Sequence, residues 1–436
     1  PILACLFSLF LASPALAAID IQEVDTPGGL KAWLVEEPSI PFTALEIRFE
    51  GGSALDAPDK RGATNLMVGL LEEGAGENDA GAFAEAAETL AADFSYDASQ
   101  DTVSISARFL SENRDEAMAL LRDSLIDPRF DQESIERVRR QVLSSIRSDQ
   151  KDPDTIANDA LESMVFGDHP YGSAIEGTEE SISALTRDDI VAAHQGALAK
   201  DRVFIAATGD ISADELATLI DTLLSDLPET GAAFPEDIEV KTTAGVTVVP
   251  YETPQSVALF GHKGIKRDDP DFFAAYVMNT ILGGGGFEAR LMEEVREKRG
   301  LTYGVYSYIL PMDHAELYLG RVASANDRIA EAVDVIRDEW RKMAETGVTQ
   351  AELDQAKTFL TGAYPLRFDG NAPIARILVG MQMDGLTPEY VTNRNAMVEA
   401  VTLEDVRRTA ARVLRPDELR FVVVGQPEGL EQTPVQ

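Results

Sequence analysis

Two side chains in the second half of this sequence have types and a spacing suited to binding a peptide backbone. Arg296 lies near the end of a charged, amphipathic segment, and Tyr303 follows seven residues later. A guanidinium donates several hydrogen bonds in a fixed planar arrangement, and a phenol donates one. Both groups could therefore reach the carbonyl oxygens of an extended peptide.

A run of four glycines precedes this segment. Because glycine has no Cβ, such a run interrupts regular structure and lets another backbone approach closely. We therefore predict a loop, then a helix that ends at Gly300, then a strand over residues 301–308. The glycines are candidates for binding substrate: Gly283, Gly284, Gly285 and Gly286. The alternative is a helix end with a surface arginine and a tyrosine at the edge of the core.

This arrangement resembles the C-terminal half of the M16 (insulinase-type or mitochondrial-processing-peptidase-like) zinc peptidases. In that family a glycine-rich stretch runs into an R-x-K-x-x-L-x-Y-like signature, on which Arg296 and Tyr303 are the arginine and the tyrosine. The resemblance implies that both side chains bind the substrate backbone and stabilise the oxygen that becomes charged during hydrolysis. The glycines resemble a shortened glycine-rich loop of the non-zinc subunit of the processing peptidase.

Active members of the family carry H-x-x-E-H on the first helix of the N-terminal half. The two imidazoles bind zinc, and the glutamate takes a proton from the zinc-bound water. The matching helix here is residues 62–74, and the motif falls on Asn65, Val68 and Gly69. An amide is a poor zinc ligand, glycine offers none, and valine moves no proton. We therefore expect no metal or other cofactor in this chain, with zinc only in a partner subunit.

No substitute for this chemistry is visible elsewhere in the sequence. The third zinc ligand of the family falls at about Ser144 or Ser145. Glu72 and Glu73 are adjacent and would face different directions, as solvated side chains do. The histidines are too far apart to form a local metal motif, and we expect surface or loop-end positions for all four: His169, His194, His262 and His314.

The chain also repeats itself. Two pairs of segments match at an offset of 216 residues and a third pair at 218: 186–191 with 402–407, 203–209 with 419–425, and 131–136 with 349–354. The first pair looks like a helix capped by threonine, and the second like a buried strand closed by glycine. Two copies of one α+β unit are the simplest explanation.

We predict an α+β protein of two homologous half-domains, each an antiparallel-rich sheet covered by helices, as in M16 or LuxS-like metallohydrolases. Residues 32–35, 44–49 and 103–109 alternate between apolar and polar residues, as half-buried strands do. The half-domains would span residues 18–230 and 240–430, joined near a linker at 227–239. Each is long enough to bury its own core.

Residues 1–17 are apolar, uncharged and end in Ala15-Leu16-Ala17, which is typical of a secretory signal peptide. The segment is too short to span a membrane. The single cysteine, Cys5, lies within it, and a lipid anchor there is disfavoured because the apolar run continues past Cys5. An exported chain without thiols or disulfides fits a bacterial periplasm.

The chain is strongly acidic, with 75 Asp and Glu against 38 Lys and Arg and a net charge of −37. Such a surface repels nucleic acids and anionic membranes, which makes both poor partners, and we expect no nucleic acid as a partner. The charge would attract a basic peptide, although solubility alone is the simpler explanation for it.

The leading hypothesis is a substrate-binding subunit, inactive alone, of a two-chain periplasmic M16 zinc peptidase. In it, Arg296 and Tyr303 would line an interior wall opposite the helix of the lost zinc motif, and an outward position of both side chains would contradict it. The partner would be a zinc-binding M16 subunit in a heterodimer, and the substrate a peptide. A structural scaffold and a stand-alone peptide-binding protein are the alternatives.

Overall fold

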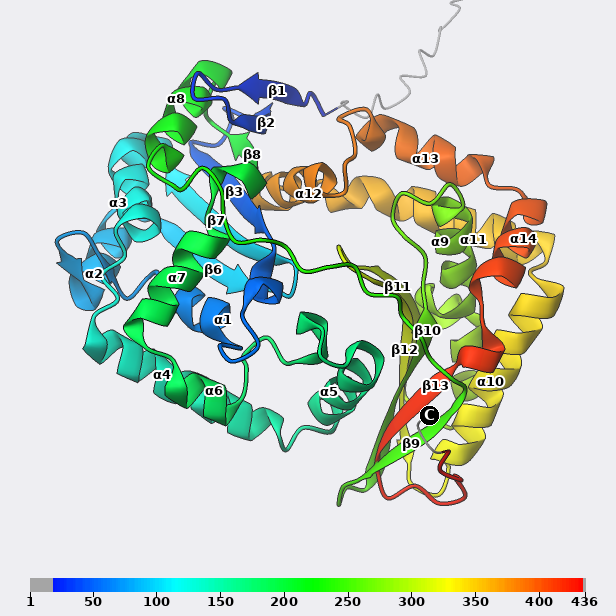
Figure 1. Cartoon of the computed structure of the whole chain (residues 1–436). Coiled ribbons are helices and arrows are strands. Elements are labelled where there is room, and N and C mark those ends of the chain that lie inside the picture. The colour runs from blue at the N-terminus through cyan, green and yellow to red at the C-terminus, as the bar shows by residue number, and fades with distance from the viewer. Residues whose placement is uncertain (1–18, 434–436) are drawn as a thin grey trace, which may run out of the picture.

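The computed structural model describes residues 19–433, so the predicted signal segment and Cys5 lie outside the described residues. The chain forms two halves, each built on one mixed sheet (Figure 1). The first sheet has the order β1-β2-β8-β3-β7-β6 and the second β11-β12-β10-β13-β9. The strands of the first are β1 (Gln22–Asp25), β2 (Lys31–Glu36), β3 (Phe42–Glu50), β6 (Asp93–Ala98), β7 (Thr102–Leu110) and β8 (Val203–Gly209). Those of the second are β9 (Gly245–Pro250), β10 (Gln255–Lys263), β11 (Val305–Pro311), β12 (Glu316–Ala325) and β13 (Arg420–Gly425), and β4 (Gly74–Ala75) pairs with β5 (Asn78–Asp79) in a separate hairpin.

The two sheets share one topology. Without the edge strand β1, the order β2-β8-β3-β7-β6 of the first corresponds to β9-β13-β10-β12-β11 of the second. In each sheet one pair is parallel, β2 with β8 and β13 with β9, and the remaining pairs are antiparallel. The predicted fold class, two repeated antiparallel-rich α+β units, is confirmed.

Helices cover the sheets in both halves. The first half contains α1 (Ala63–Val68), α2 (Ala80–Thr89), α3 (Arg114–Ile126), α4 (Gln132–Asp149), α5 (Pro153–Phe166), α6 (Glu179–Ala184), α7 (Arg187–Ala197) and α8 (Ala213–Leu224). The second contains α9 (Phe272–Asn279), α10 (Ile329–Thr346), α11 (Gln350–Ala363), α12 (Asn371–Met383), α13 (Tyr390–Ala400) and α14 (Leu403–Val413). The repeated helices α7 and α14 begin at the predicted threonine caps: the Thr186 hydroxyl accepts from the Asp189 amide at 3.3 Å, and the Thr402 hydroxyl from the Asp405 amide at 3.1 Å.

The two halves exchange equivalent helices. Helix α5 of the first half packs on β10 and β13 of the second sheet, and α12 of the second half packs on β3 and β8 of the first (Figure 1). The two helices begin at Pro153 and Asn371, 218 residues apart, which is the offset of the third repeat pair. Leu378 on α12 is fully buried with Trp33 and Ala206 of the first sheet. Apolar burial thus ties each half to the other.

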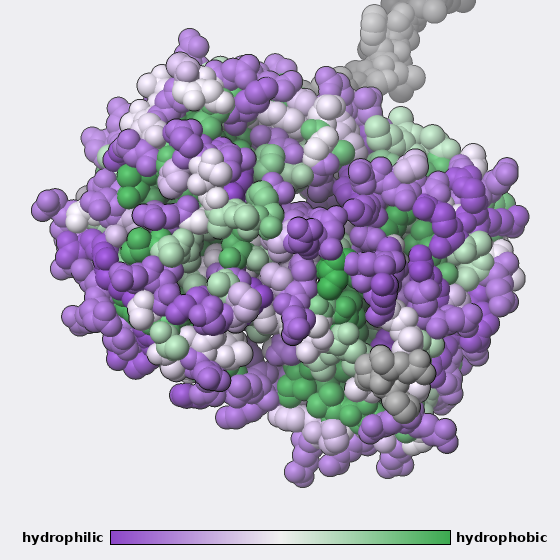
Figure 2. Space-filling view, viewed as in Figure 1, coloured by the Kyte–Doolittle hydropathy of each residue, from purple (hydrophilic) through white to green (hydrophobic). Residues whose placement is uncertain are grey.

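Hydrophilic residues cover most of the face seen in Figure 2, in keeping with the acidic composition. Within residues 19–433, every helix is too short or too polar to cross a membrane.

The prediction of surface or loop-end positions is wrong for two of the four histidines. His194 is buried in α7, where its Nε2 lies 2.8 Å from the Leu125 carbonyl, and burial lowers its pKa. His262 is fully buried in β10. Both therefore belong to the packed interior of their half.

His262 is held neutral chiefly by its burial, and two donors occupy its Nε2. Its Nδ1 donates to the Lys263 carbonyl at 2.6 Å, and its Nε2 accepts from Trp340 Nε1 at 2.9 Å and from the Arg415 amide at 3.3 Å. Protonating Nε2 would place a third N–H against two donors. Burial lowers the pKa of His262 to about 4. The sequence did not predict this buried, hydrogen-bonded position of His262, because Trp340 and Arg415 are far from it in the chain.

We expect acidification to destabilise the protein through His262. Its pKa is about 4 in the folded chain against an ordinary 6.5, so the unfolded chain takes up the proton first as the pH falls. The stability that the neutral imidazole contributes is complete above pH 6.5 and is lost towards pH 4, with about 2 kcal/mol gone between pH 7 and pH 5. Urea unfolding at both pH values measures the loss. A His262→Asn variant shares every other titrating group, and an equal loss in that variant would contradict the assignment.

Candidate functional site

The glycine run is not the predicted loop. Helix α9 continues into a π-helical turn, η5 (Thr280–Gly284), and only Gly285 and Gly286 leave it. A Cβ added at Gly283 would lie 2.3 Å from the Ser307 hydroxyl of β11, and one at Gly285 would lie 2.5 Å from the Thr280 carbonyl. Gly283 therefore allows close packing of the helix on the strand, and Gly285 allows the chain to leave the π-helical turn close to the Thr280 carbonyl. Gly286, with φ of +63° and open space around it, is the position that needs glycine for a turn.

Gly283→Ala should lower the free energy of unfolding by about 1–3 kcal/mol, because the added methyl collides with Ser307 in a packed core. Gly362→Ala is the matched control, since it lies in α11 with open space around it and should stabilise the helix by about 0.5–1 kcal/mol. Chemical denaturation of the two variants measures both values. Equal stability of Gly283→Ala and the wild type would mean that the glycine run is kept for a ligand and not for packing.

The segment after the glycines also differs from the prediction. A π-helical element, η7 (Met292–Glu297), replaces a regular α-helix, and Gly300 ends it with φ of +61°. The strand begins at Val305 and not at Leu301. The reason is a turn in which the Thr302 hydroxyl donates to the Ala323 carbonyl at 2.6 Å and accepts from the Gly304 amide at 3.1 Å. Leu301 meanwhile packs into the core.

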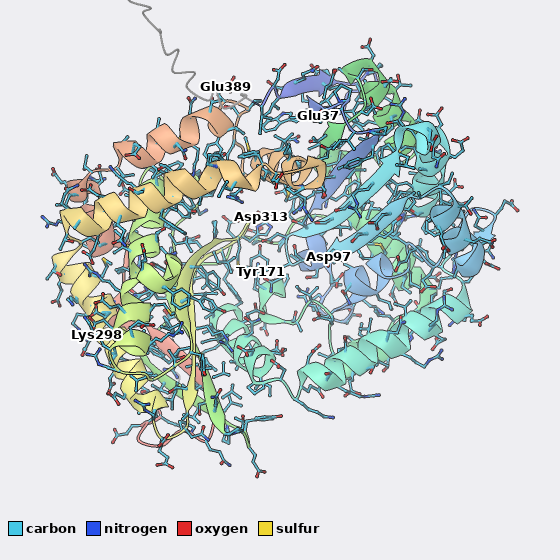
Figure 3. The ribbon with its side chains drawn as sticks, turned by 180° about the vertical axis from the view of Figure 1, so that it is seen from behind. Glu37, Asp97, Tyr171, Lys298, Asp313 and Glu389 are labelled. Carbon is cyan, nitrogen blue, oxygen red and sulfur yellow. The ribbon has the colours of Figure 1, made fainter. Side chains whose placement is uncertain are left out.

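Arg296 and Tyr303 lie on the outside of the second half. The Arg296 guanidinium is 4.6 Å from the centre of the exposed Phe287 ring and 3.5 Å from the Glu297 carboxylate. Tyr303 is 91% exposed. Figure 3 labels Lys298, two residues from Arg296, at the outer edge of the second half. Neither side chain lines a cavity among the described residues, so the expectation that they form the wall of an interior site is wrong. Both are available only to a molecule outside this chain.

The positions of the zinc motif lie on α1, in the other half. The helix is shorter than predicted, because it ends at Gly69 and the chain then turns towards β4. Its start is fixed by the buried Asp56 carboxylate, which accepts from the amides of Gly62 at 2.9 Å and Thr64 at 3.0 Å. Burial raises the pKa of Asp56 to about 6.

None of these positions fits zinc. Asn65 is half-buried, and Val68 is a core residue with 4% exposure. The space beside Gly69 is filled by Val138, whose side chain would lie 3.1 Å from an added Cβ. Ser144 and Ser145 are exposed on α4. Within residues 19–433, no group of three or more His, Cys, Asp or Glu side chains is arranged to hold a metal ion. Helix α1 therefore offers no set of side chains that could bind zinc.

A titratable network where the halves meet escaped the sequence analysis. Tyr171 of the first half donates its hydroxyl to Asp101 and accepts from the His314 amide of the second half at 3.1 Å. His314 Nδ1 lies 3.2 Å from Asp237 of the linker. Burial raises the pKa of Asp313 to about 7. Figure 3 shows Tyr171 and Asp313 between the halves, far from Lys298. Only the fold brings these residues together.

Next to this network is a cavity of about 1190 Å³ between α5 and the second sheet. The charged residues of its lining are acidic except for one cation, Arg321, which is bound to Asp154 through two hydrogen bonds. Burial raises the pKa of Glu162 to about 7 and raises that of Asp159, whose neighbouring carboxylates add to the shift. A cavity of this kind favours a cationic group.

Comparison with known proteins identifies the family. Residues 31–179 match the family model described as Insulinase (Peptidase family M16), and residues 184–360 match the model described as Peptidase M16 inactive domain. A protein named non-peptidase homolog YmxG, from Helicobacter pylori, is 30% identical over 334 residues, which cover 76% of this chain and 77% of that protein. The chain belongs to the M16 peptidase family.

Other M16 comparisons agree. An uncharacterized zinc protease of Streptomyces coelicolor is 26% identical over 401 residues, 90% of this chain and 87% of the relative. The crystal structure of a peptidase M16 inactive domain from Pseudomonas fluorescens superposes with a TM-score of 0.88 at 31% identity, covering 96% of this chain and all of that one. A protease from Helicobacter pylori, with a TM-score of 0.83 and 16% identity, shares the fold. The chain is thus an M16 homologue of the inactive-domain type.

Proposed function

We propose that this chain is the substrate-binding, non-catalytic subunit of a two-chain M16 zinc peptidase. A partner M16 chain with an intact H-x-x-E-H motif would hold the zinc, and this chain would supply Arg296 and Tyr303. The guanidinium would bind a peptide carbonyl, and the phenol would donate to the oxygen that becomes charged during hydrolysis. The other three glycines of the run have close internal contacts, so only Gly286, beside the exposed Phe287, has open space in which to contact a peptide.

One observation carries the proposal: the zinc-motif positions on α1 offer no zinc ligands in a chain that matches the model described as Peptidase M16 inactive domain, so the metal would have to come from another chain. Arg296 and Tyr303 belong to the other half and line no cavity that α1 also borders, so in this proposal they act on a peptide held against a second chain. A second chain that covers Tyr303 would bring a zinc site to it. The 91% exposure of a large phenol is what such an arrangement requires before assembly.

Export belongs to the same proposal. Residues 1–17 would direct the chain to the periplasm and be removed there, which leaves the mature chain without cysteine. Cell fractionation followed by N-terminal sequencing tests this directly. Recovery of the uncleaved chain in the cytoplasm would contradict it.

We expect the native chain to co-purify with a zinc-binding M16 protein in a stable heterodimer. Affinity purification from periplasm, followed by mass spectrometry and size-exclusion chromatography, is the measurement. An Arg296→Gln variant should still bind this partner, since one rim side chain adds little to a large interface. Purification of the chain alone, without any M16 partner at native expression levels, would contradict the proposal.

The acidic cavity favours a second candidate, a stand-alone peptide-binding protein. Its carboxylates would bind basic peptides without any partner. Calorimetry with the purified single chain separates the two functions. Tight binding of a basic peptide without a partner supports the second, and binding only in the heterodimer supports the first.

A further inference from the structure

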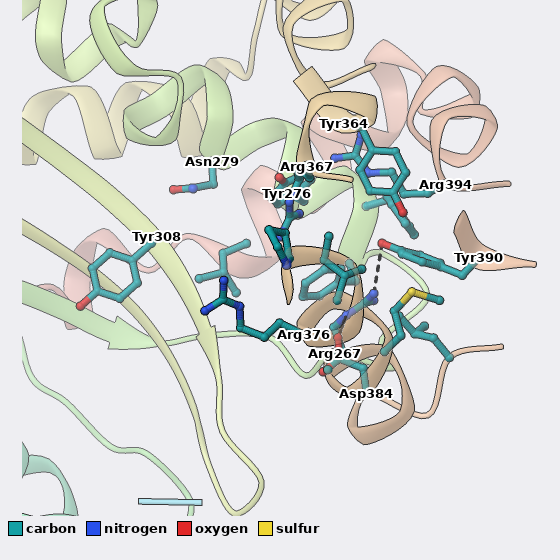
Figure 4. Close-up of a pocket in the computed structure, with 18 residues that line it drawn as sticks. Arg267, Tyr276, Asn279, Tyr308, Tyr364, Arg367, Arg376, Asp384, Tyr390 and Arg394 are labelled. Carbon is teal, nitrogen blue, oxygen red and sulfur yellow. Dashed lines mark hydrogen bonds and ion pairs between the residues drawn. The ribbon is translucent and has the colours of Figure 1, made fainter. Parts of the chain in front are cut away.

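A second cavity, of about 750 Å³, lies wholly among elements of the C-terminal half (Figure 4). It is bounded by α9 and the loop before it, by β11, by the short helix η8 (Tyr364–Arg367), and by α12 and α13. Four arginines from four separate segments line it, together with six aromatic rings. They are Arg267, Arg367, Arg376 and Arg394, and Phe272, Phe273, Tyr276, Tyr308, Tyr364 and Tyr390.

The positive charge of this cavity is only partly neutralised. Arg267 pairs with Asp384, the one acidic residue of the lining, at 3.1 Å. Arg394 is buried and donates to the Leu360 carbonyl at 2.8 Å. Among residues 19–433, no carboxylate forms an ion pair with Arg367 or Arg376, and both residues are exposed. Arg376 also borders a smaller cavity that Glu46 and Asp93 of the first half line, so Arg367 is the less neutralised of the two. In a chain with 75 acidic and 38 basic residues, four arginines around one carboxylate form a local site for an anion.

The aromatic lining points to a ligand with an apolar or flat body. The Arg267 guanidinium lies 4.4 Å from the Phe272 ring centre, and that of Arg394 lies 4.7 Å from the Tyr364 ring centre. Such stacking holds the arginines in place while their edges stay free to donate. The Tyr364 hydroxyl is buried just beneath the cavity surface and has no hydrogen-bond partner among the described residues.

We propose that this cavity binds a small molecule with an anionic head, a carboxylate or a phosphate, joined to an aromatic or apolar body. Arg367 and Arg376 would bind the head, since a guanidinium matches either anion through two parallel hydrogen bonds. The rings of Tyr276, Tyr308 and Tyr390 would cover the body. The site is separate from Arg296 and Tyr303 and needs neither zinc nor a partner chain, so it goes beyond the function proposed above.

The test is calorimetry on the purified mature chain with two matched pairs of probes. One pair is a tripeptide ending in phenylalanine, as the free acid and as the C-terminal amide; the other is adenosine monophosphate and adenosine. We expect at least one acid to bind roughly tenfold or more tightly than its neutral twin. An Arg367→Gln and Arg376→Gln double variant should lose this preference, whereas Arg341→Gln, on the exposed face of α10, should keep it.

A preference for the acid in the peptide pair identifies a peptide carboxylate as the ligand, and a preference in the nucleotide pair identifies a phosphate. Either preference supports the site. Both replaced arginines are exposed, so we expect the double variant to fold, and its thermal unfolding verifies this. The proposal is overturned if neither acid binds better than its neutral twin. It is also overturned if a folded double variant keeps the preference.

Discussion

Tyr303→Phe should lower kcat of the reconstituted heterodimer about 100-fold, since one lost donor to a developing oxyanion costs about 3 kcal/mol of barrier. The phenylalanine keeps the ring and removes only the hydroxyl. Because the donor acts mainly in the transition state, KM should change little. Steady-state hydrolysis of a peptide substrate by the purified complex gives both constants.

Tyr306→Phe is the matched control, because Tyr306 is a second exposed phenol, 45% accessible, only three residues further along the chain. It should leave kcat within about twofold, as expected for a surface change away from the reacting atoms. Partner affinity should be the same for wild type and both variants. A Tyr303→Phe complex as active as the wild type would remove Tyr303 from the mechanism.

Leu378→Ala should destabilise the whole chain by about 2–5 kcal/mol, and not the second half alone. Leu378 belongs to α12 of the second half, but it is buried against Trp33 of the first sheet. The cavity left by the deleted methyl groups would therefore lie between the halves. Since α5 makes the reciprocal contact with the second sheet, neither half buries its apolar sheet face without the other.

The two tryptophans allow the unfolding of each half to be measured separately. Trp33 lies in the first sheet and Trp340 in the core of the second half. Fluorescence-detected unfolding of Trp340→Phe reports the first half, and that of Trp33→Phe reports the second. Adding Leu378→Ala should shift both transitions by similar amounts, whereas Leu366→Ala, 78% exposed, should shift neither by more than about 0.5 kcal/mol. A shift confined to one half would mean that the halves unfold independently.

The parts of this fold that the sequence predicts are those fixed by local interactions. Thr186 and Thr402 are followed three residues later by acids that complete a capping box, so the helix starts are visible without tertiary structure. The alternating strand of residues 103–109 is likewise a local pattern, and it lies within β7. Repetition of such signals at a constant offset predicts two copies of one unit.

The parts that escaped prediction depend on contacts between distant segments. Gly283 suggested an open loop, but its neighbour is Ser307, on a strand that no local pattern places beside it. The buried role of His262 depends on Trp340, 78 residues away. The exchange of α5 and α12 depends on which sheet each helix packs against. Helix periodicity in the sequence predicts which residues are apolar and buried, but it does not predict the sheet that buries them.

Zinc analysis combined with activity is the most direct test of the central claim, that this chain completes a site whose metal is held elsewhere. The measurement is metal content by mass spectrometry and chelator-sensitive peptide hydrolysis, for this chain, its M16 partner and the equimolar mixture. We predict no bound zinc and no hydrolysis for this chain, one zinc held by the partner, and full activity only in the mixture. One tightly bound zinc and peptide hydrolysis by this chain alone would contradict the account.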